Sequence, residues 1–189
     1  MPASGADSGT PSLEVALGKA RTQAGESLLE VTGRAPTLIL FLRHFGCTFC
    51  KENLSDAARL RPSLDAAGTQ LAFVHLGTEA EAAEFMKTYG FQDLPRVSDP
   101  EMRLYRAFML RRFRWWQLFD VGTWIRGWQS LKSGNRQGKA VGDPLQLSGA
   151  FLVSGGRILG SFRQNVASDR PDLESLAACP IPQAGNPLR

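Results

Sequence analysis

The sequence predicts an α/β fold in which a central mixed sheet is flanked by helices. Two continuous apolar runs, 37–43 and 70–76, are typical of buried parallel strands. Each run precedes a segment in which apolar residues recur at helical spacing. Two shorter apolar segments flank Gly155-Gly156, a pair that favours a tight hairpin turn. Parallel strands joined through helices, followed by an antiparallel hairpin, predict one mixed sheet.

The expected elements follow the chain in a simple order. They are a helix or two short helices at 12–31, a strand at 37–43, a helix at 47–67, a strand at 70–76, a helix at 79–89, a short strand at 95–98, a helix from Asp99 or Pro100 to Leu110, the hairpin at 150–162 and a last helix at 173–178. Pro62 is expected to kink or end the first part of its helix. This order of elements is that of a thioredoxin-like fold.

The domain organisation follows from composition. Residues 12–180 are expected to form a single domain, with a basic aromatic insertion at 111–146 before the hairpin. Residues 1–11, rich in Ala, Ser, Gly and Pro, are expected to be a disordered tail, and 181–189 a C-terminal tail.

Charge, hydropathy and cysteine usage exclude several classes. Hydrophobic content of 43% and charged content of 21% are ordinary for a globular protein, and no apolar run is long enough to span a bilayer. The first residues lack the apolar core of a signal peptide. Three cysteines are too few for a disulfide scaffold. We therefore expect a cytoplasmic protein whose cysteines serve chemistry.

The stretch Cys47-Thr48-Phe49-Cys50 carries that chemistry. It lies where the strand at 37–43 turns into a helix, and the free backbone N–H groups at a helix N-terminus favour an anion such as a thiolate. Two cysteines three apart on a helix share one face and can close a small disulfide. We expect Cys47 to be the attacking thiolate and Cys50 the resolving thiol.

The helix terminus alone does not ionise Cys47 at neutral pH. A free thiol has a pKa of about 8.5, and a helix N-terminus contributes roughly 0.3 to 1 kcal/mol, less than the 1.4 kcal/mol that one pKa unit represents. Cys47 therefore needs a positive neighbour. The local candidates are Arg43, His44 and Lys51, and strand alternation directs at most one of the first two toward the turn.

Two other interpretations of the cysteine pair remain open, vestigial thiols and a metal site. Zinc usually takes four ligands, and only Cys179, His44 and His75 remain to complete a set. We favour redox chemistry and expect neither a metal nor a cofactor. Cys179 is expected to be a small apolar filler or a free thiol, with a distant resolving cysteine as the alternative, and His75 a core or edge histidine.

The string from Phe41 to Glu52, containing Arg43-His44-Phe45-Gly46-Cys47-x-x-Cys50, resembles the signature of the AhpC/TSA-related, peroxiredoxin-like proteins of the thioredoxin superfamily. Three further pieces fall in that family's order: His75-Leu76-Gly77-Thr78, Ser98-Asp99-Pro100 with the following Leu104-Tyr105-Arg106-Ala107, and the run from Gln146 to Val153. The resemblance implies a thioredoxin fold, a redox-active dithiol, a disulfide or peroxide substrate and an external thiol reductant. A peroxidase that reduces hydroperoxides through Cys47 is the alternative activity.

The sequence departs from both prototypes of that superfamily. Peroxiredoxins carry a Pro and a Thr before the reactive cysteine, where this chain has Leu40 and His44, and an Arg at the later strand, where it has Ser148. Thioredoxins have a cis-Pro where this chain has Gly149 and a buried acid where it has Phe41. Gly149 is therefore a supporting site candidate.

The insertion concentrates charge and tryptophan. Nine Lys/Arg and one acid lie between Arg103 and Lys139. Residues 121–131 place Trp124 and Trp128 on an apolar helical stripe. We expect Trp116, Trp124 and Trp128 to form a lid over the dithiol or a contact between two copies in a homodimer. A basic amphipathic surface at 111–139 that binds an anionic membrane, without any turnover, is the alternative. No nucleic acid is expected, because no groove-reading motif accompanies the charge.

Overall fold

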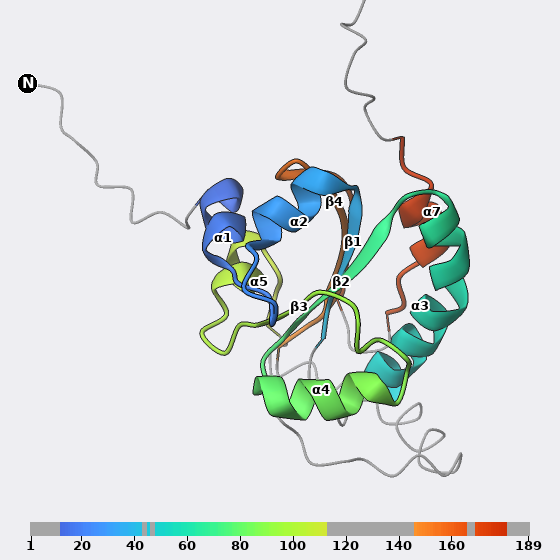
Figure 1. Cartoon of the computed structure of the whole chain (residues 1–189), viewed down its shortest axis with the longest axis horizontal. Coiled ribbons are helices and arrows are strands. Elements are labelled where there is room, and N and C mark those ends of the chain that lie inside the picture. The colour runs from blue at the N-terminus through green and yellow to red at the C-terminus, as the bar shows by residue number, and fades with distance from the viewer. Residues whose placement is uncertain (1–11, 43–44, 46–47, 113–145, 166–168, 181–189) are drawn as a thin grey trace, which may run out of the picture.

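A five-stranded mixed sheet in the order β3-β2-β1-β4-β5 forms the centre of the computed structural model (Figure 1). The structure describes residues 12–42, 45, 48–112, 146–165 and 169–180, and for 48–50 the backbone alone. The described elements are α1 (Leu13–Lys19), α2 (Leu28–Arg34), β1 (Thr37–Phe41), α3 (Thr48–Ala66), β2 (Gln70–His75), α4 (Glu79–Lys87), β3 (Arg96–Ser98), α5 (Arg103–Ala107), β4 (Gly149–Ser154), β5 (Arg157–Arg163) and α7 (Leu173–Ala177).

The directions of the strands confirm the predicted mixed sheet. β1 pairs in parallel with β2, and β2 in parallel with β3, whereas β4 runs antiparallel to both β1 and β5. The hairpin turns at Gly155 and Gly156, whose φ values of 54° and 77° favour glycine. β1 is the central strand and all five of its residues are buried. The position of its carboxyl end is therefore fixed by neighbouring strands on both sides. Residues 43–50, which contain Cys47 and Cys50 and are called the dithiol segment below, follow this end.

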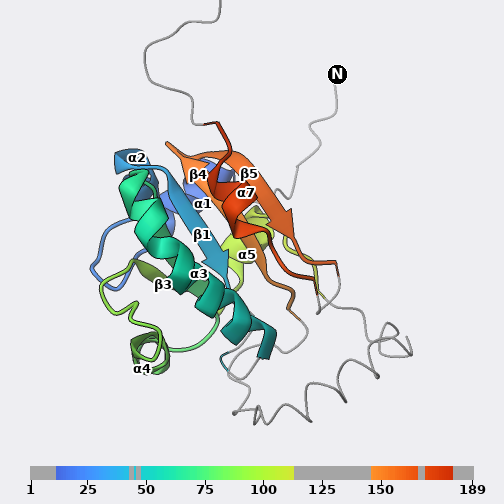
Figure 2. The same cartoon turned by 90° about the vertical axis from the view of Figure 1, so that its right-hand side faces the viewer.

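Two layers of helices cover the sheet, one on each face. α1, α2 and α5 pack over the face that carries Ile39, Phe41 and Phe151, whereas α3, α4 and α7 pack over the face of Leu38, Leu40 and Phe73. In Figure 2 α3 lies along β1. The alternation of strand side chains thus divides the apolar core into two clusters, and α3 belongs wholly to one of them.

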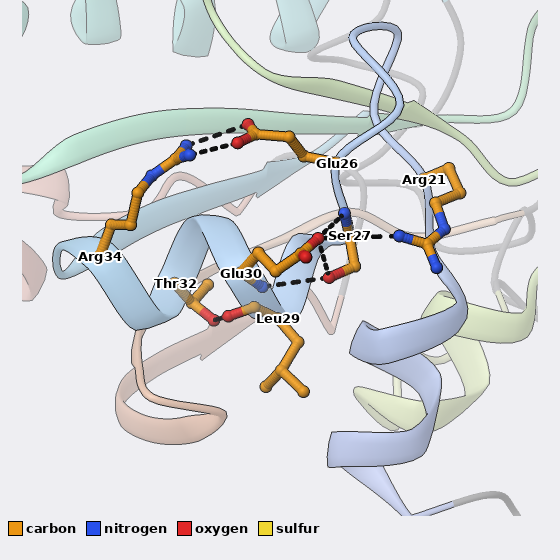
Figure 3. A network of polar contacts seen from close by, with 7 residues as sticks. All are labelled: Arg21, Glu26, Ser27, Leu29, Glu30, Thr32 and Arg34. Carbon is orange, nitrogen blue, oxygen red and sulfur yellow. Dashed lines mark hydrogen bonds and ion pairs between the residues drawn. The ribbon is translucent and has the colours of Figure 1, made fainter.

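The region at 12–34 contains two short helices, as the sequence allowed. α2 opens with a capping box in which the Glu30 backbone N–H donates to Ser27 Oγ at 3.2 Å and the Ser27 backbone N–H donates to Glu30 Oε2 at 2.7 Å (Figure 3). Arg34 forms a two-pronged ion pair with Glu26. These contacts hold the loop between the two helices.

Pro62 does not end its helix, and one predicted helix start is wrong. α3 continues from Thr48 to Ala66 with Pro62 inside it, because Leu54, Ala57 and Leu64 keep their buried face across the proline. The loss of one backbone hydrogen bond at a proline does not outweigh that burial here. The helix expected from Asp99 or Pro100 begins instead at Arg103, after Met102 in a left-handed conformation with φ of 56°.

Parts of the predicted organisation lie outside the described residues. These are the two tails, 1–11 and 181–189, and 113–145 of the insertion, including Trp116, Trp124 and Trp128. Among the helices that the structure describes, none is both long and apolar enough to cross a membrane.

Candidate active site

The carboxyl end of β1 leads directly into α3. Leu42 continues the strand's pairing, since its backbone N–H donates to the Val74 carbonyl at 2.9 Å, and α3 begins at Thr48. Cys47 therefore immediately precedes the helix in sequence, and Cys50 belongs to its first turn. Arg43, His44, Gly46 and Cys47 themselves lie outside the described residues, as do the side chains of 48–50. Lys51 is half-buried in the next position of α3.

The end of β1 is tied to α5 from the other face of the sheet. The buried Tyr105 hydroxyl donates to the Leu42 carbonyl at 2.5 Å, and its ring meets Phe41 edge-on at 5.0 Å. Asp99 fixes the start of α5 by accepting from the backbone N–H groups of Arg103, Leu104 and Tyr105 at 2.9, 2.8 and 3.3 Å. Burial raises the pKa of Asp99, and these three donors oppose the rise.

Tyr105 has no predicted role beyond its place in the family resemblance. An aromatic residue in a short helix is usually a core residue. The hydroxyl contact of Tyr105 could not be predicted, because its partner, Leu42, lies 63 positions earlier in the chain. The structure shows that α5 reaches the residue from which the dithiol segment starts.

Gly149 lies opposite Phe41 in the antiparallel pairing of β1 and β4, next to the end of β1. It is buried, and an added Cβ would lie 2.7 Å from Leu110 Cδ2 and 2.8 Å from the Phe162 carbonyl oxygen. Both distances are too short for a carbon contact. Glycine is therefore required here by packing of the neighbouring strand and of Leu110.

Ser148 occupies a neutral, buried environment. Its backbone N–H donates to Gln164 Oε1 at 3.0 Å, and it is 5% exposed. Arg163, the neighbouring arginine on β5, directs its guanidinium to the other face, where Nε donates to the Phe108 carbonyl at 2.9 Å and the group lies 4.8 Å from the Phe151 ring centre. Burial lowers the pKa of Arg163. Arg163 therefore does not supply a positive charge on the α3 face in place of the arginine that peroxiredoxins carry at the position of Ser148.

A small cavity lies between β1, β4 and α3. It measures about 10 Å³ and is lined by Leu40, Phe41, Leu42, Asn53, Ser148, Gly149, Phe162 and Pro171. That volume holds about one water molecule. This cavity is therefore too small for an organic substrate.

His75 ends β2 beside the dithiol segment and is 1% exposed, which confirms the predicted core position. Its Nδ1 lies 3.1 Å from the Gly77 carbonyl, and its ring centre lies 5.6 Å from that of Phe45. Burial lowers the pKa of His75 to about 4, so the ring is neutral at pH 7. Phe45, which lies between β1 and α3, also packs against Phe85 of α4 with 4.8 Å between the ring centres.

Comparison with known families decides the classification. The model of the family described as "AhpC/TSA antioxidant enzyme" matches residues 56–166, more than half of the chain. The chain belongs to the AhpC/TSA antioxidant enzyme family. The match begins within α3 and includes neither Cys47 nor Cys50. The family assignment therefore rests on the strands and helices that follow these two cysteines.

Relatives with similar sequences carry two kinds of name. Prostamide/prostaglandin F synthase of Salmo salar is 29% identical over 147 residues, covering 75% of this chain and 72% of the relative. Peroxiredoxin-like 2A of Homo sapiens is 27% identical over 165 residues, covering 82% of this chain and 66% of the relative. Both alignments extend over most of this AhpC/TSA chain.

Solved structures confirm the thioredoxin-like fold through peroxiredoxins. The bacterioferritin comigratory protein of Xanthomonas campestris superimposes with a TM-score of 0.54 at 18% identity, covering 78% of this chain and 81% of that one. Peroxidoxin BcpB of Mycobacterium tuberculosis does so with a TM-score of 0.55 at 14% identity, covering 78% and 80%. At such identities these likenesses concern the fold alone.

Within the described part of this AhpC/TSA chain, no three His, Cys, Asp or Glu side chains gather as a metal site would require. Cys179 is a free, half-buried thiol on the turn after α7, with Sγ 3.7 Å from the Ser175 carbonyl. His75 belongs to no such group among these residues.

Proposed function

We propose that this chain is a thiol–disulfide redox protein in which Cys47 attacks and Cys50 resolves. One observation carries the proposal: the buried strand β1 ends at Phe41 and α3 begins soon after it, at Thr48. A cysteine just before a 19-residue helix meets free N–H groups and the positive end of the helix dipole, both of which favour the thiolate. Membership of the AhpC/TSA family supports thiol redox chemistry.

The reaction balances without a cofactor. The Cys47 thiolate attacks a substrate disulfide, forming a mixed disulfide and releasing one substrate thiolate. Cys50 then loses its proton, displaces the second substrate thiolate and closes the Cys47–Cys50 disulfide. An external dithiol reductant returns both cysteines to the thiol form and is itself oxidised. Arg43, His44 and Lys51 are the proposed cations that lower the pKa of Cys47 further.

A peroxidase is the second candidate, because the relatives and structural neighbours include proteins named peroxiredoxin-like 2A and one whose structure concerns alkyl peroxide reduction. In that reaction the Cys47 thiolate takes one peroxide oxygen to become a sulfenic acid and releases an alcohol or water. Cys50 then condenses with the sulfenic acid, releasing water. The neutral Ser148, where peroxiredoxins have an arginine, favours disulfide exchange over this activity.

Competition between substrates tests the proposal. Reduced protein is mixed in turn with a small disulfide, hydrogen peroxide and an organic hydroperoxide, and loss of the two reactive thiols is followed by rapid quenching and mass spectrometry. We expect fast disulfide exchange, slow peroxide oxidation and trapping of mixed disulfides at Cys47 in Cys50→Ser. Cys179→Ser is the matched control and should behave like the parent chain. If the cysteines react with none of the three reagents, or if Cys179→Ser alone abolishes activity, the assignment of Cys47 and Cys50 is wrong.

A further inference from the structure

A hollow lies between α1, the end of β3 and α5, on the face of the sheet opposite to α3 (Figure 1). Its volume is about 640 Å³. Small-molecule sites in proteins usually measure about 300 to 1,000 Å³, so the hollow is large enough for a ligand. All residues that line it belong to the part of the chain that the structure describes.

The floor of the hollow is apolar. Ala16 of α1, Val97 of β3 and Leu104 of α5 line it, and each of the three is at most 7% exposed. Asp99 holds α5 beside this floor, because its carboxylate accepts hydrogen bonds from the first backbone N–H groups of that helix. The apolar part of a small molecule can therefore bind on a surface that the fold has already formed.

Cationic side chains surround this floor, and two of them are already paired. Arg21, which follows α1, forms an ion pair with Glu30 at 3.7 Å. Arg103 of α5 forms an ion pair with Glu101, which also lines the hollow. These two arginines contribute little net positive charge, because a carboxylate balances each of them.

Lys19 and Arg106 line the same hollow and form no ion pair with any other described residue. Lys19 belongs to the last turn of α1 and Arg106 to α5, so the two charges come from different helices. Both side chains are exposed. Arg106 attracts Asp99, but that carboxylate already accepts three backbone N–H groups. Two positive charges therefore remain without a direct partner beside an apolar floor.

We propose that this hollow binds a small organic phosphate monoester, with Lys19 and Arg106 as the groups that bind its phosphate. A phosphate monoester carries a charge of about −1.5 to −2 at pH 7, which matches two unpaired cations better than the single charge of a carboxylate. An arginine donates two parallel N–H bonds to a phosphate, and a lysine binds it as a point charge. The organic group lies against Ala16, Val97 and Leu104. This binding site does not depend on the reaction proposed for Cys47 and Cys50.

Phenyl phosphate is a suitable probe, because it joins a dianionic phosphate to one apolar ring. The full chain, labelled with nitrogen-15, is titrated with it at pH 7 and low salt, and the backbone amide signals are followed by NMR. We expect saturable shifts concentrated at residues 16–21 and 97–106, with a dissociation constant on the order of 1 mM or below. Lys19→Gln and Arg106→Gln should each raise this constant roughly 3- to 10-fold.

Two further probes separate the phosphate from its organic group. Inorganic phosphate has no apolar part, and benzoate has the ring but a single charge. We expect each to bind roughly fivefold or more weakly than phenyl phosphate. Inorganic phosphate binding as tightly as phenyl phosphate would show that the ligand is not an organic ester. Benzoate binding as tightly would show that the site does not select a dianion.

Lys87→Gln and Arg157→Gln are the matched controls. Lys87 is an exposed lysine in the last turn of α4, as Lys19 is in α1, and Arg157 is an exposed arginine of β5. Neither lines the hollow, so both variants should bind phenyl phosphate as the parent chain does. If they weaken binding as much as Lys19→Gln and Arg106→Gln do, the ligand responds only to overall charge and the proposal is wrong. Shifts concentrated at 111–139, the basic insertion, would overturn it as well.

Discussion

At the scale of single residues, Gly149 shows how the absence of a side chain organises the end of β1. Leu110 and the Phe162 carbonyl both occupy the volume that a Cβ would need. Gly149 is a site candidate from the sequence because of its position in the family pattern. The structure gives it a packing role next to that site instead, and a role toward substrate stays a prediction.

Gly149→Ala is expected to lower the free energy of unfolding by about 1 to 3 kcal/mol, the usual effect of overpacking. Equilibrium urea unfolding measures it. Gly33→Ala is the matched control, because Gly33 is exposed in α2 with no atom within 4 Å of an added Cβ. That control should stabilise the chain by roughly 0.5 to 1 kcal/mol, the helical preference of alanine over glycine. A Gly149→Ala chain as stable as the parent would show that Leu110 moves aside freely.

At the scale of elements, α5 is a five-residue helix that would not persist by itself. Asp99 satisfies three of its first N–H groups, and Tyr105 connects it to the Leu42 carbonyl. The short helix thus holds the strand end from which the dithiol segment departs. The sequence predicts a helix start at Asp99 or Pro100, because the left-handed turn at Met102 has no local sequence signal.

Asp99→Ala is expected to lower the free energy of unfolding by about 1 to 2 kcal/mol, since it leaves the N–H groups of α5 without an acceptor. Glu101→Ala removes only an exposed ion pair with Arg103 and should change the value by less than about 1 kcal/mol. Urea unfolding of both variants at pH 7 compares them. Equal effects would mean that the cap adds nothing beyond surface charge.

At the scale of the whole molecule, the free energy of unfolding depends on pH because the core buries His75. Burial lowers the pKa of His75 from 6.5 to about 4. Between these values the unfolded chain binds the proton more strongly than the folded chain, so protonation favours unfolding. The neutral ring makes its full contribution to the free energy of unfolding above pH 6.5, and this contribution is lost as the pH falls toward 4.

We therefore expect the free energy of unfolding of the parent chain to fall between pH 6.5 and 4 by about 3 kcal/mol more than that of His75→Gln. The glutamine variant carries all other titrating groups, so subtracting the two curves isolates the histidine. Urea titrations at intervals of one pH unit give both curves. Parallel curves would show that the ring is not held neutral in the folded chain.

The sequence was sufficient for the order of elements, the mixed sheet and the hairpin, because continuous apolar strands and Gly155-Gly156 are local signals. It was insufficient where tertiary contacts decide. Pro62 does not end α3 because the buried face continues past it, and the link from Tyr105 to Leu42 joins distant positions. His75 was predicted as a core or edge histidine and lies in the core, but its unpaired Nε2 is visible only once its neighbours are placed.

The packing of the Cys179 sulfur against β5 has a practical consequence for labelling. A Cβ at Gly160 would lie 2.8 Å from Cys179 Sγ, so this sulfur rests directly on β5 under the end of α7. The strand side of this half-buried sulfur is covered, so a maleimide should react with it more slowly than with a fully exposed thiol. In a labelling time course, the rate at this thiol therefore separates Cys179 from the two cysteines proposed to react, Cys47 and Cys50.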